Sequence, residues 1–315
     1  MLLSILILFI GLAALILGGD FLVKGSSSIA LRLKISPLVV GLTVVAFGTS
    51  VPELLISVKS ALAGSPDLAM GNVIGSNICN LAMILGISAI ISPIYVQKNS
   101  LTIDWPMTMG SSLLLYLLVR EGFVDSYEGI LFISILVIYV VFIVRKSRRD
   151  MKVVRNLEQE FDLPKTQHTL LKDLSYILLG SAGLYFGAEW FVGSAQEFAR
   201  QLGIEERVIG ITVLAIGTSL PELITSTVAS FKKETDLALG NLMGSNIFNI
   251  LSILGITSII KEIRVSDVIL NTDIIWMLGV TLVVLPLMLT RRKVGRVDGL
   301  ILLLIYIFYT YTVVW

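Results

Sequence analysis

The sequence predicts an all-α integral membrane protein with ten transmembrane helices, arranged as two inverted five-helix repeats. Three observations lead to this prediction. Of the 315 residues, 55% are hydrophobic and only 15% are charged, whereas soluble domains carry about 25% charged residues. Long apolar stretches alternate with short polar ones, as expected when lipid is the solvent. Finally, two motifs of the first half recur in the second half at one constant spacing.

The apolar stretches define the expected helices, each long enough to cross about 30 Å of hydrocarbon. The first stretch lacks the basic beginning of a signal peptide, so we expect it to remain as a spanning helix. The expected helices cover residues 3–32, 37–63, 67–92, 101–119, 127–145, 173–201, 207–231, 236–260, 268–290 and 298–314.

Lysine and arginine residues predict the orientation of the chain in the membrane. With the N-terminus outside, the inner loops would hold 17 basic residues and the outer loops five. Cytoplasmic loops are enriched in Lys and Arg, so we expect a plasma-membrane protein with both termini outside. The charged segment 146–172 would then be cytoplasmic. We interpret it as a linker, in preference to a regulatory or phospholipid-binding segment.

The internal repeat divides the chain into two halves. Residues 41–53 read GLTVVAFGTSVPE and residues 210–222 read GITVLAIGTSLPE, with nine of 13 positions identical. Residues 71–80 read GNVIGSNICN and residues 240–249 read GNLMGSNIFN, with seven of ten identical. Both motifs recur after 169 positions. We therefore expect a first repeat at 1–145, a linker at 146–172 and a second repeat at 173–315.

An odd number of spans in each repeat has a geometric consequence. After five spans the second repeat must enter the membrane from the opposite side. Inverted repeats are a transporter architecture, in which the substrate site lies near the bilayer midplane where the two repeats meet. The sequence therefore favours a transporter over an enzyme.

The first motif combines a helix break with a carboxylate. Pro52 and Pro221 have no N–H group to donate, so each should break its helix and leave a carbonyl free. Such a carbonyl is tolerated within a bilayer where it lines a cavity. Glu53 and Glu222 follow directly, and a carboxylate at this depth usually serves an ion or proton pathway. The motifs also supply the hydroxyl oxygens of Thr49, Ser50, Thr218 and Ser219.

The second motif places a polar stripe on one face of a helix. Its side chains recur at every fourth position, and the glycines between them permit close helix approach. We expect this helix to press against the broken helix of the other repeat, with its polar groups facing the carboxylates. The stripe comprises Asn72, Ser76 and Asn80 in the first half, and Asn241, Ser245 and Asn249 in the second.

The predicted pocket offers hard oxygen donors. The chain has one cysteine, Cys79, and one histidine, His168, so neither a disulfide within the chain nor a multi-histidine metal site is possible. Carboxylate, carbonyl, hydroxyl and amide oxygens suit Ca²⁺, which takes about six to eight of them, and Na⁺ is similar in size. Two glutamates would be neutralised by one Ca²⁺, two Na⁺ or two protons. An empty pocket would leave two charges at low dielectric, which favours obligatory exchange.

These paired motifs resemble the two alpha repeats of the Na⁺/Ca²⁺ exchanger branch of the Ca²⁺/cation antiporter superfamily, and the resemblance spans the chain. It implies four cation sites between helices 2, 3, 7 and 8, about three Na⁺ exchanged per Ca²⁺ by alternating access, and a sliding gate formed by helices 1 and 6. Glu53 and Glu222 would be shared ligands. The resemblance further implies hydroxyl ligands from Thr49, Ser50, Ser76, Thr218, Ser219 and Ser245, backbone carbonyls from Ala46 and Ala215, and amides from Asn80 and Asn249.

Several alternatives remain open at this point. Asn249 stands where K⁺-dependent relatives carry an acid, and Gly75 and Gly244 stand where proton-coupled relatives carry one. A H⁺-driven or K⁺-assisted cation exchanger is therefore the second hypothesis. An intramembrane hydrolase using Ser50 or Ser219 lacks a nearby histidine, and a channel is a further possibility. We expect a monomer in the lipid bilayer with Ca²⁺ and Na⁺ as substrates, no cofactor and no nucleic-acid partner.

Overall fold

The computed structural model describes residues 2–157, 169–201 and 217–314. This part of the chain is almost entirely helical, and its strands are four two-residue segments at the turns between helices. Six helical segments are long and apolar enough to cross a membrane, or seven if one bent pair counts as a single span. The chain thus has the helices of a multi-pass membrane protein.

The first half follows the expected helices closely. Its elements are α1 (Leu2–Leu33), α2 (Pro37–Val40), η1 (Gly41–Val45), α3 (Ala46–Thr49), α4 (Val51–Leu62), α5 (Pro66–Ile78), η2 (Cys79–Ile84), α6 (Leu85–Ile91), β1 (Ile94–Tyr95), η3 (Ser100–Asp104), α7 (Trp105–Leu118), η4 (Val119–Glu121), β2 (Phe123–Val124) and α8 (Ser126–Leu157).

The second half repeats this order within the described residues. Its elements are α9 (Leu170–Gln201), α12 (Leu220–Phe231), α13 (Thr235–Phe248), η6 (Asn249–Leu254), α14 (Gly255–Ile260), β3 (Ile263–Arg264), η7 (Ile269–Asp273), α15 (Ile274–Leu289), η8 (Thr290–Arg292), β4 (Lys293–Val294) and α16 (Arg296–Val314). Most of the N-terminal half of the expected helix 207–231 lies outside the described residues.

One expected boundary differs from the structure. We placed the end of the fifth helix at residue 145 and a linker after it, but α8 continues to Leu157. The basic sequence RKSRRDMK is compatible with a helix because Arg, Lys and Met all have high helix propensity. Apolar patterning marks the end of a membrane span and not the end of the helix that carries it. The first part of the expected linker is therefore helical.

The predicted helix break is present at Ser50. Its backbone leaves helical geometry (φ −86°, ψ 6°), and the helical segments on its two sides are bent by 45°. Pro52 lies in the first turn of α4, where its missing N–H group costs no helical hydrogen bond. The break therefore places the end of the repeated first motif, with Glu53, at the start of a new helix.

Several spans contain short π-helical segments that the sequence analysis did not anticipate. Segment η2 begins at Cys79, directly before the predicted site residue Asn80, and η6 begins at the predicted site residue Asn249. The segments η3 and η7 occupy matching places before α7 and α15. Single π turns inside α-helices occur frequently at functional sites. Their recurrence in both halves shows that the repeat extends to local backbone geometry.

The strands show how the two halves face each other. In sequence, β1 corresponds to β3 and β2 to β4. In space, however, β1 pairs with β4 and β2 with β3, both antiparallel. The turn after α6 thus lies beside the turn after α15, and the turn after α7 lies beside the turn after α14. Corresponding turns of the two halves therefore belong to different strand pairs.

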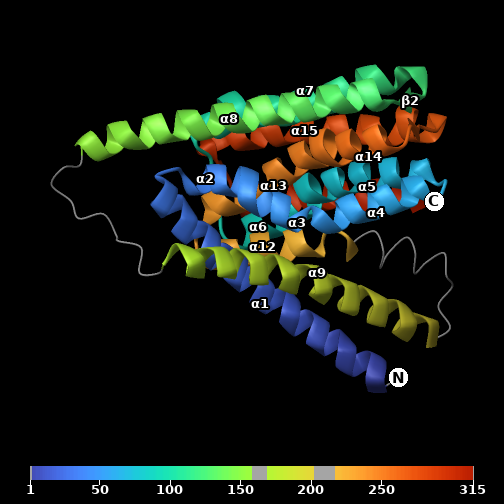
Figure 1. Ribbon diagram of the computed structural model, residues 1–315, viewed down its shortest axis with the longest axis horizontal. Coiled ribbons are helices and arrows are strands. Elements are labelled where there is room, and N and C mark those ends of the chain that lie inside the picture. Colours follow the sequence, from blue (N-terminus) through green and yellow to red (C-terminus); the bar gives the residue numbers. More distant parts are fainter. Residues whose placement is uncertain (1, 158–168, 202–216, 315) are drawn as a thin grey trace.

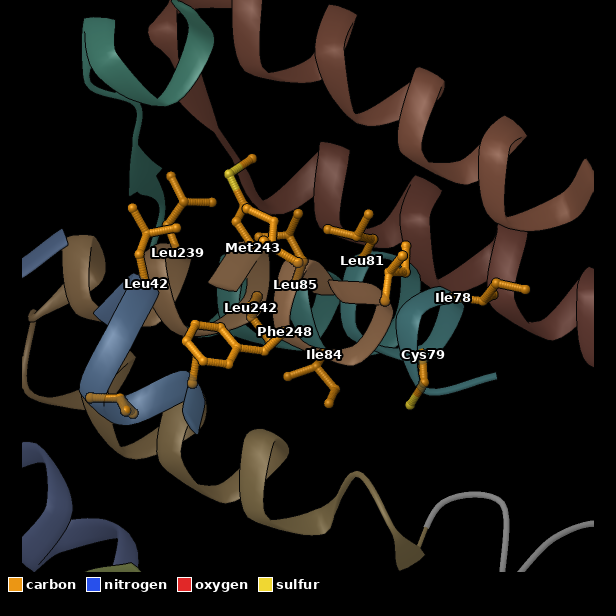
Figure 2. Packing of buried hydrophobic residues seen from close by; sticks show 14 of the residues in the cluster. Leu42, Ile78, Cys79, Leu81, Ile84, Leu85, Leu239, Leu242, Met243 and Phe248 are labelled. Atoms are coloured by element: carbon orange, nitrogen blue, oxygen red, sulfur yellow. The ribbon is translucent and has the colours of Figure 1, made fainter. Parts of the chain in front are cut away.

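The helices form a central group flanked by two outer groups. In Figure 1, α4, α5 and α13 lie in the middle, α1 and α9 lie along one side, and α7, α8 and α15 lie along the other. Helices α5 and α13, with the π-helical segments η2 and η6 that follow them, contribute many of the buried apolar side chains. Figure 2 shows part of the hydrophobic core, where Leu42 of the first motif lies among residues of both second motifs and their flanks, including Leu81, Leu85, Leu239 and Met243.

Helices α1 and α9 cross in very close contact through glycines. A Cβ atom placed on Gly18 would lie 2.7 Å from the backbone nitrogen of Leu184, and one on Gly187 would lie 2.8 Å from that of Leu15. Gly18 and Gly187 occupy corresponding positions of the two halves. Small residues of this kind permit backbones to approach within a membrane. The first helices of the two halves therefore pack directly on each other.

Candidate cation site

Glu222 is held by hydroxyl groups from two different helices. Its side chain is fully buried near the start of α12. Its Oε1 accepts a hydrogen bond from Ser50 Oγ at 3.2 Å and another from Ser245 Oγ at 3.4 Å. Ser50 belongs to the break of the first half, whereas Ser245 belongs to α13. A predicted ligand from one half thus contacts the predicted carboxylate of the other half.

Thr49 extends this cluster. Its Oγ1 lies 3.4 Å from Ser245 Oγ and donates to Asn241 Oδ1 at 3.2 Å. Asn241 in turn donates to Ser226 Oγ on α12 at 3.0 Å. The corresponding pair of the first half, Asn72 and Ser57, has the same hydrogen bond at 3.1 Å. In each half, the polar stripe is therefore anchored to the helix that follows the break.

Glu53 faces Glu222 across the boundary between the halves. Both carboxyl groups are fully buried, and Ser50, which bonds Glu222, precedes Glu53 by three residues in the chain. Neither carboxyl oxygen of Glu53, nor Oε2 of Glu222, has a hydrogen-bond partner within the described part of the chain. Neighbouring buried carboxylates can both be charged when a cation lies with them, and otherwise a proton neutralises one of them. The arrangement is suited to binding a cation between the two halves.

The two halves are not identical at this point. Ser219 corresponds to Ser50 and Glu53 to Glu222, yet Ser219 Oγ has no partner among the described residues. Ser50 therefore bonds Glu222 across the boundary, whereas Ser219 makes no corresponding hydrogen bond to Glu53 within the described residues. The cluster has sequence symmetry but differs in its hydrogen bonds.

Four asparagines join the second motifs of the two halves. Asn80 Nδ2 donates to Asn246 Oδ1, and Asn249 Nδ2 donates to Asn77 Oδ1, each at 3.0 Å. All four side chains are buried. The Oδ1 atoms of Asn80 and Asn249 have no partner within the residues that the structure describes. The predicted amide ligands therefore present free oxygens.

The four remaining predicted ligands lie in different surroundings or, for one, outside the described residues. Ser76 is buried, and its hydroxyl has no partner in the described regions. The Ala46 carbonyl already accepts hydrogen bonds from Ser50 N at 3.0 Å and Thr49 Oγ1 at 3.3 Å. Thr218 is half-buried beside the second break. Ala215 lies outside the described residues, so its expected role has no structural counterpart here.

The expected contact between second motif and broken helix is present on one side. Helix α13 packs on α2, η1 and α3. A Cβ atom on Gly244 would lie 2.7 Å from Cα of Leu42, and one on Gly41 would lie 2.6 Å from the Leu237 carbonyl. Only glycine permits such proximity. The matching contact of α5 would involve residues outside the described part of the chain.

Sequence reasoning missed Asn77 and Asn246. Both stand in the repeated GSN triplet, but they are one position beyond Ser76 and Ser245 and therefore lie off the polar stripe. Both side chains are buried, and each donates a hydrogen bond to the backbone carbonyl of the other, a contact that exists only between the two halves. The signal available in the sequence was their identity in both copies.

Comparison with known proteins agrees with the geometry. The profile of the family described as sodium/calcium exchanger protein matches residues 3–145 and 172–315. The chain belongs to the sodium/calcium exchanger family. The segment between the two matched regions corresponds to the expected linker. As a family member the chain is a multi-pass membrane transporter.

Relatives of this exchanger-family member match it from end to end. The putative antiporter CaxA of Alkalimonas amylolytica is 37% identical, over 99% of this chain and 98% of its own. The sodium/calcium exchanger MaX1 of Methanosarcina acetivorans is 30% identical, over 96% of each chain. A solved structure of the sodium-calcium exchanger NCX_Mj, soaked without Na⁺ and Ca²⁺, superposes with a TM-score of 0.85 at 31% identity, over 99% of each chain.

Proposed function

We propose that this protein exchanges Ca²⁺ for Na⁺ by alternating access, at a site near the bilayer midplane built around Glu53 and Glu222. The observation that supports the proposal is the complete burial of these two carboxyl groups, one from each half, with the hydroxyl of Ser50 joining the break before Glu53 to Glu222. Charge balance then requires bound cations in every state that moves. Na⁺ and Ca²⁺ fit the surrounding oxygens, and they are the ions named for MaX1 and NCX_Mj.

The proposed ligand set follows the cluster around the two acids. Thr49, Ser50, Ser76, Ser219 and Ser245 would supply hydroxyl oxygens, and Asn80 and Asn249 amide oxygens. Thr218 and the backbone carbonyls of Ala46 and Ala215 complete the set proposed from the sequence. The free oxygens of Glu53, Ser76, Ser219, Asn80 and Asn249 support it, because buried polar atoms without partners ordinarily require an explanation. A hard cation such as Ca²⁺ or Na⁺ would satisfy them.

The architecture proposed here is ten spans in two inverted repeats, 1–145 and 173–315, joined by the cytoplasmic segment 146–172. The strand pairs support it, because each turn lies beside the turn that has the same predicted side of the membrane. The unequal hydrogen bonding of Ser50 and Ser219 also supports it. An inverted-repeat transporter opens to one side by placing its two halves in different conformations. We further propose a monomer in the plasma membrane with both termini outside.

A flux experiment in proteoliposomes tests the proposed function. Vesicles loaded with Na⁺ and diluted into Na⁺-free medium should accumulate ⁴⁵Ca²⁺ without a pH gradient and without K⁺. Uptake that requires a pH gradient, or K⁺, would instead establish the second hypothesis. Ca²⁺ entry at a similar rate without any exchangeable cation inside would contradict obligatory exchange and indicate a channel.

A further inference from the structure

The asparagines of the two GSNxxN motifs form a closed hydrogen-bonded set across the boundary between the halves. Asn77 and Asn80 belong to α5 and η2, whereas Asn246 and Asn249 belong to α13 and η6. All four are at most 1% exposed. Asn77 and Asn246 are absent from the ligand set proposed above, so their contacts need a separate explanation.

Backbone carbonyls determine the orientation of these amides. Asn246 Nδ2 donates to the carbonyl oxygen of Asn77 at 3.0 Å. A carbonyl can only accept, so this end of the Asn246 side chain must be its NH₂ group. The other end is then the oxygen, and it accepts from Asn80 Nδ2 at 3.0 Å. Because the NH₂ group of Asn80 is engaged, the amide oxygen of Asn80 points elsewhere.

The corresponding residues repeat the same logic. Asn77 Nδ2 donates to the carbonyl oxygen of Asn246 at 3.3 Å, which leaves Asn77 Oδ1 as an acceptor. Asn249 Nδ2 donates to this oxygen at 3.0 Å. The amide oxygen of Asn249 is consequently the end that remains unengaged. Each half thus sets the amide orientation of the other half.

The segments that carry the two free oxygens pack on the helices that carry the acids. Helical segment η2, with Asn80, packs on α12, which carries Glu222, and η6, with Asn249, packs on α4, which carries Glu53. Both Oδ1 atoms are buried without a partner in the described regions, an arrangement that is unfavourable if nothing binds there. A transported cation would remove this cost, whereas an amide turned the other way would present its NH₂ group and repel the cation.

We propose that Asn77 and Asn246 are positioning residues that fix the amides of Asn80 and Asn249 with oxygen toward the transported cation. This inference rests on the proposed function. It adds an explanation of why the side-chain amides of two proposed ligands, Asn80 and Asn249, have a fixed orientation. Neither positioning residue touches the cation. Each acts through the asparagine that the opposite half contributes.

Equilibrium Ca²⁺ binding to the purified full-length protein tests the inference. Asn246→Leu removes the acceptor for Asn80 while keeping the branched shape and the number of heavy atoms of the side chain. The Kd for Ca²⁺ should rise roughly 10- to 100-fold, the usual effect of losing a group that orients a metal ligand. The matched control is Thr281→Val, which removes a buried hydroxyl that bonds the Met277 carbonyl within α15. Its Kd should equal that of the wild type.

A second background separates positioning from general damage to the structure. In Asn80→Asp protein the residue at position 80 has oxygen at both ends, so its orientation no longer matters. Adding Asn246→Leu to that background should therefore leave the Kd for Ca²⁺ unchanged. An equal weakening in both backgrounds, or a wild-type Kd for Asn246→Leu alone, would overturn the inference.

Glu53→Gln, measured alongside, distinguishes the two levels of the argument. If it loses Ca²⁺ binding while Asn246→Leu retains wild-type affinity, the positioning role is wrong and the proposed function stands. If Glu53→Gln retains wild-type affinity, the proposed function fails, and the positioning role fails with it.

Discussion

Ser50 donates a hydrogen bond to Glu222 over 3.2 Å, and this contact joins the helix break of one half to the carboxylate of the other. Ser50 can reach the acid because the chain leaves helical geometry at this residue. The first motif therefore has two effects from one sequence. It ends a helix and it turns a hydroxyl group toward the opposite half.

Ser50→Ala should weaken Ca²⁺ binding about tenfold or more, because a hydrogen bond to a charged group contributes about 1.5–3 kcal/mol. Isothermal titration of the purified protein measures this change. Ser134→Ala is the control, since the Ser134 hydroxyl lies on the exposed face of α8 and bonds the Ile130 carbonyl. Equal affinities for the two variants would exclude Ser50 from the site.

Gly18→Ala should lower the melting temperature. The added Cβ would lie 2.7 Å from the backbone nitrogen of Leu184, and such overpacking costs about 1–3 kcal/mol. Gly279→Ala on α15 is a matched change, because no atom of the described structure lies within 4 Å of its new Cβ. It should preserve or raise the melting temperature. Thermal unfolding in detergent compares them, and a Gly18→Ala protein as stable as Gly279→Ala would contradict the close α1–α9 crossing.

Arg32→Gln should destabilise the protein by about 3 kcal/mol, because it leaves the buried carboxylate of Asp173 without its charge partner. Arg32 Nη2 lies 2.9 Å from Asp173 Oδ2, and Asp173 is fully buried. Adding Asp173→Asn should recover much of that loss, which a double-mutant cycle measures. The exposed pair Arg264 and Glu262 is the control, since Arg264→Gln should change stability by less than about 1 kcal/mol. Similar losses for the two arginine variants would be inconsistent with the burial of Asp173.

Arg120 and Thr290 test the inverted arrangement. They occupy corresponding exposed ends of α7 and α15, and the inverted repeat places Arg120 outside and Thr290 inside the cell. In a Cys79→Ala background, Arg120→Cys should react with an impermeant maleimide in intact cells, whereas Thr290→Cys should react only after permeabilisation. Labelling of both from the same side would exclude inverted repeats.

The sequence predicted the helices and the acids because both have strong local signals. Spans follow from runs of apolar residues, and Glu53 and Glu222 follow from a repeated motif containing proline. The π segments at Cys79 and Asn249 could not be predicted in this way, since one extra residue per turn leaves no apolar pattern of its own. Likewise, the end of α8 at Leu157 depends on helix propensity beyond the membrane, where hydropathy carries no information.

The part of the site that escaped prediction depends on contacts between distant residues. Asn77 and Asn246 are separated by 169 positions, and the side chain of each donates a hydrogen bond to the backbone carbonyl of the other. No periodicity within one helix reveals such a pair. A repeat does offer a guide, because a polar residue retained in both copies but placed off the polar stripe must find its partner in the other copy.

The most direct test of the central claim is Na⁺-driven ⁴⁵Ca²⁺ uptake by proteoliposomes containing the wild type, Glu53→Gln or Glu222→Gln. Both substitutions keep the size of the side chain and remove one of the two charges that the cations must balance. Glu262→Gln, at an exposed acid, serves as the control. We predict exchange for the wild type and for Glu262→Gln and none for either buried variant, whereas exchange at the wild-type rate by Glu53→Gln or Glu222→Gln would contradict the account.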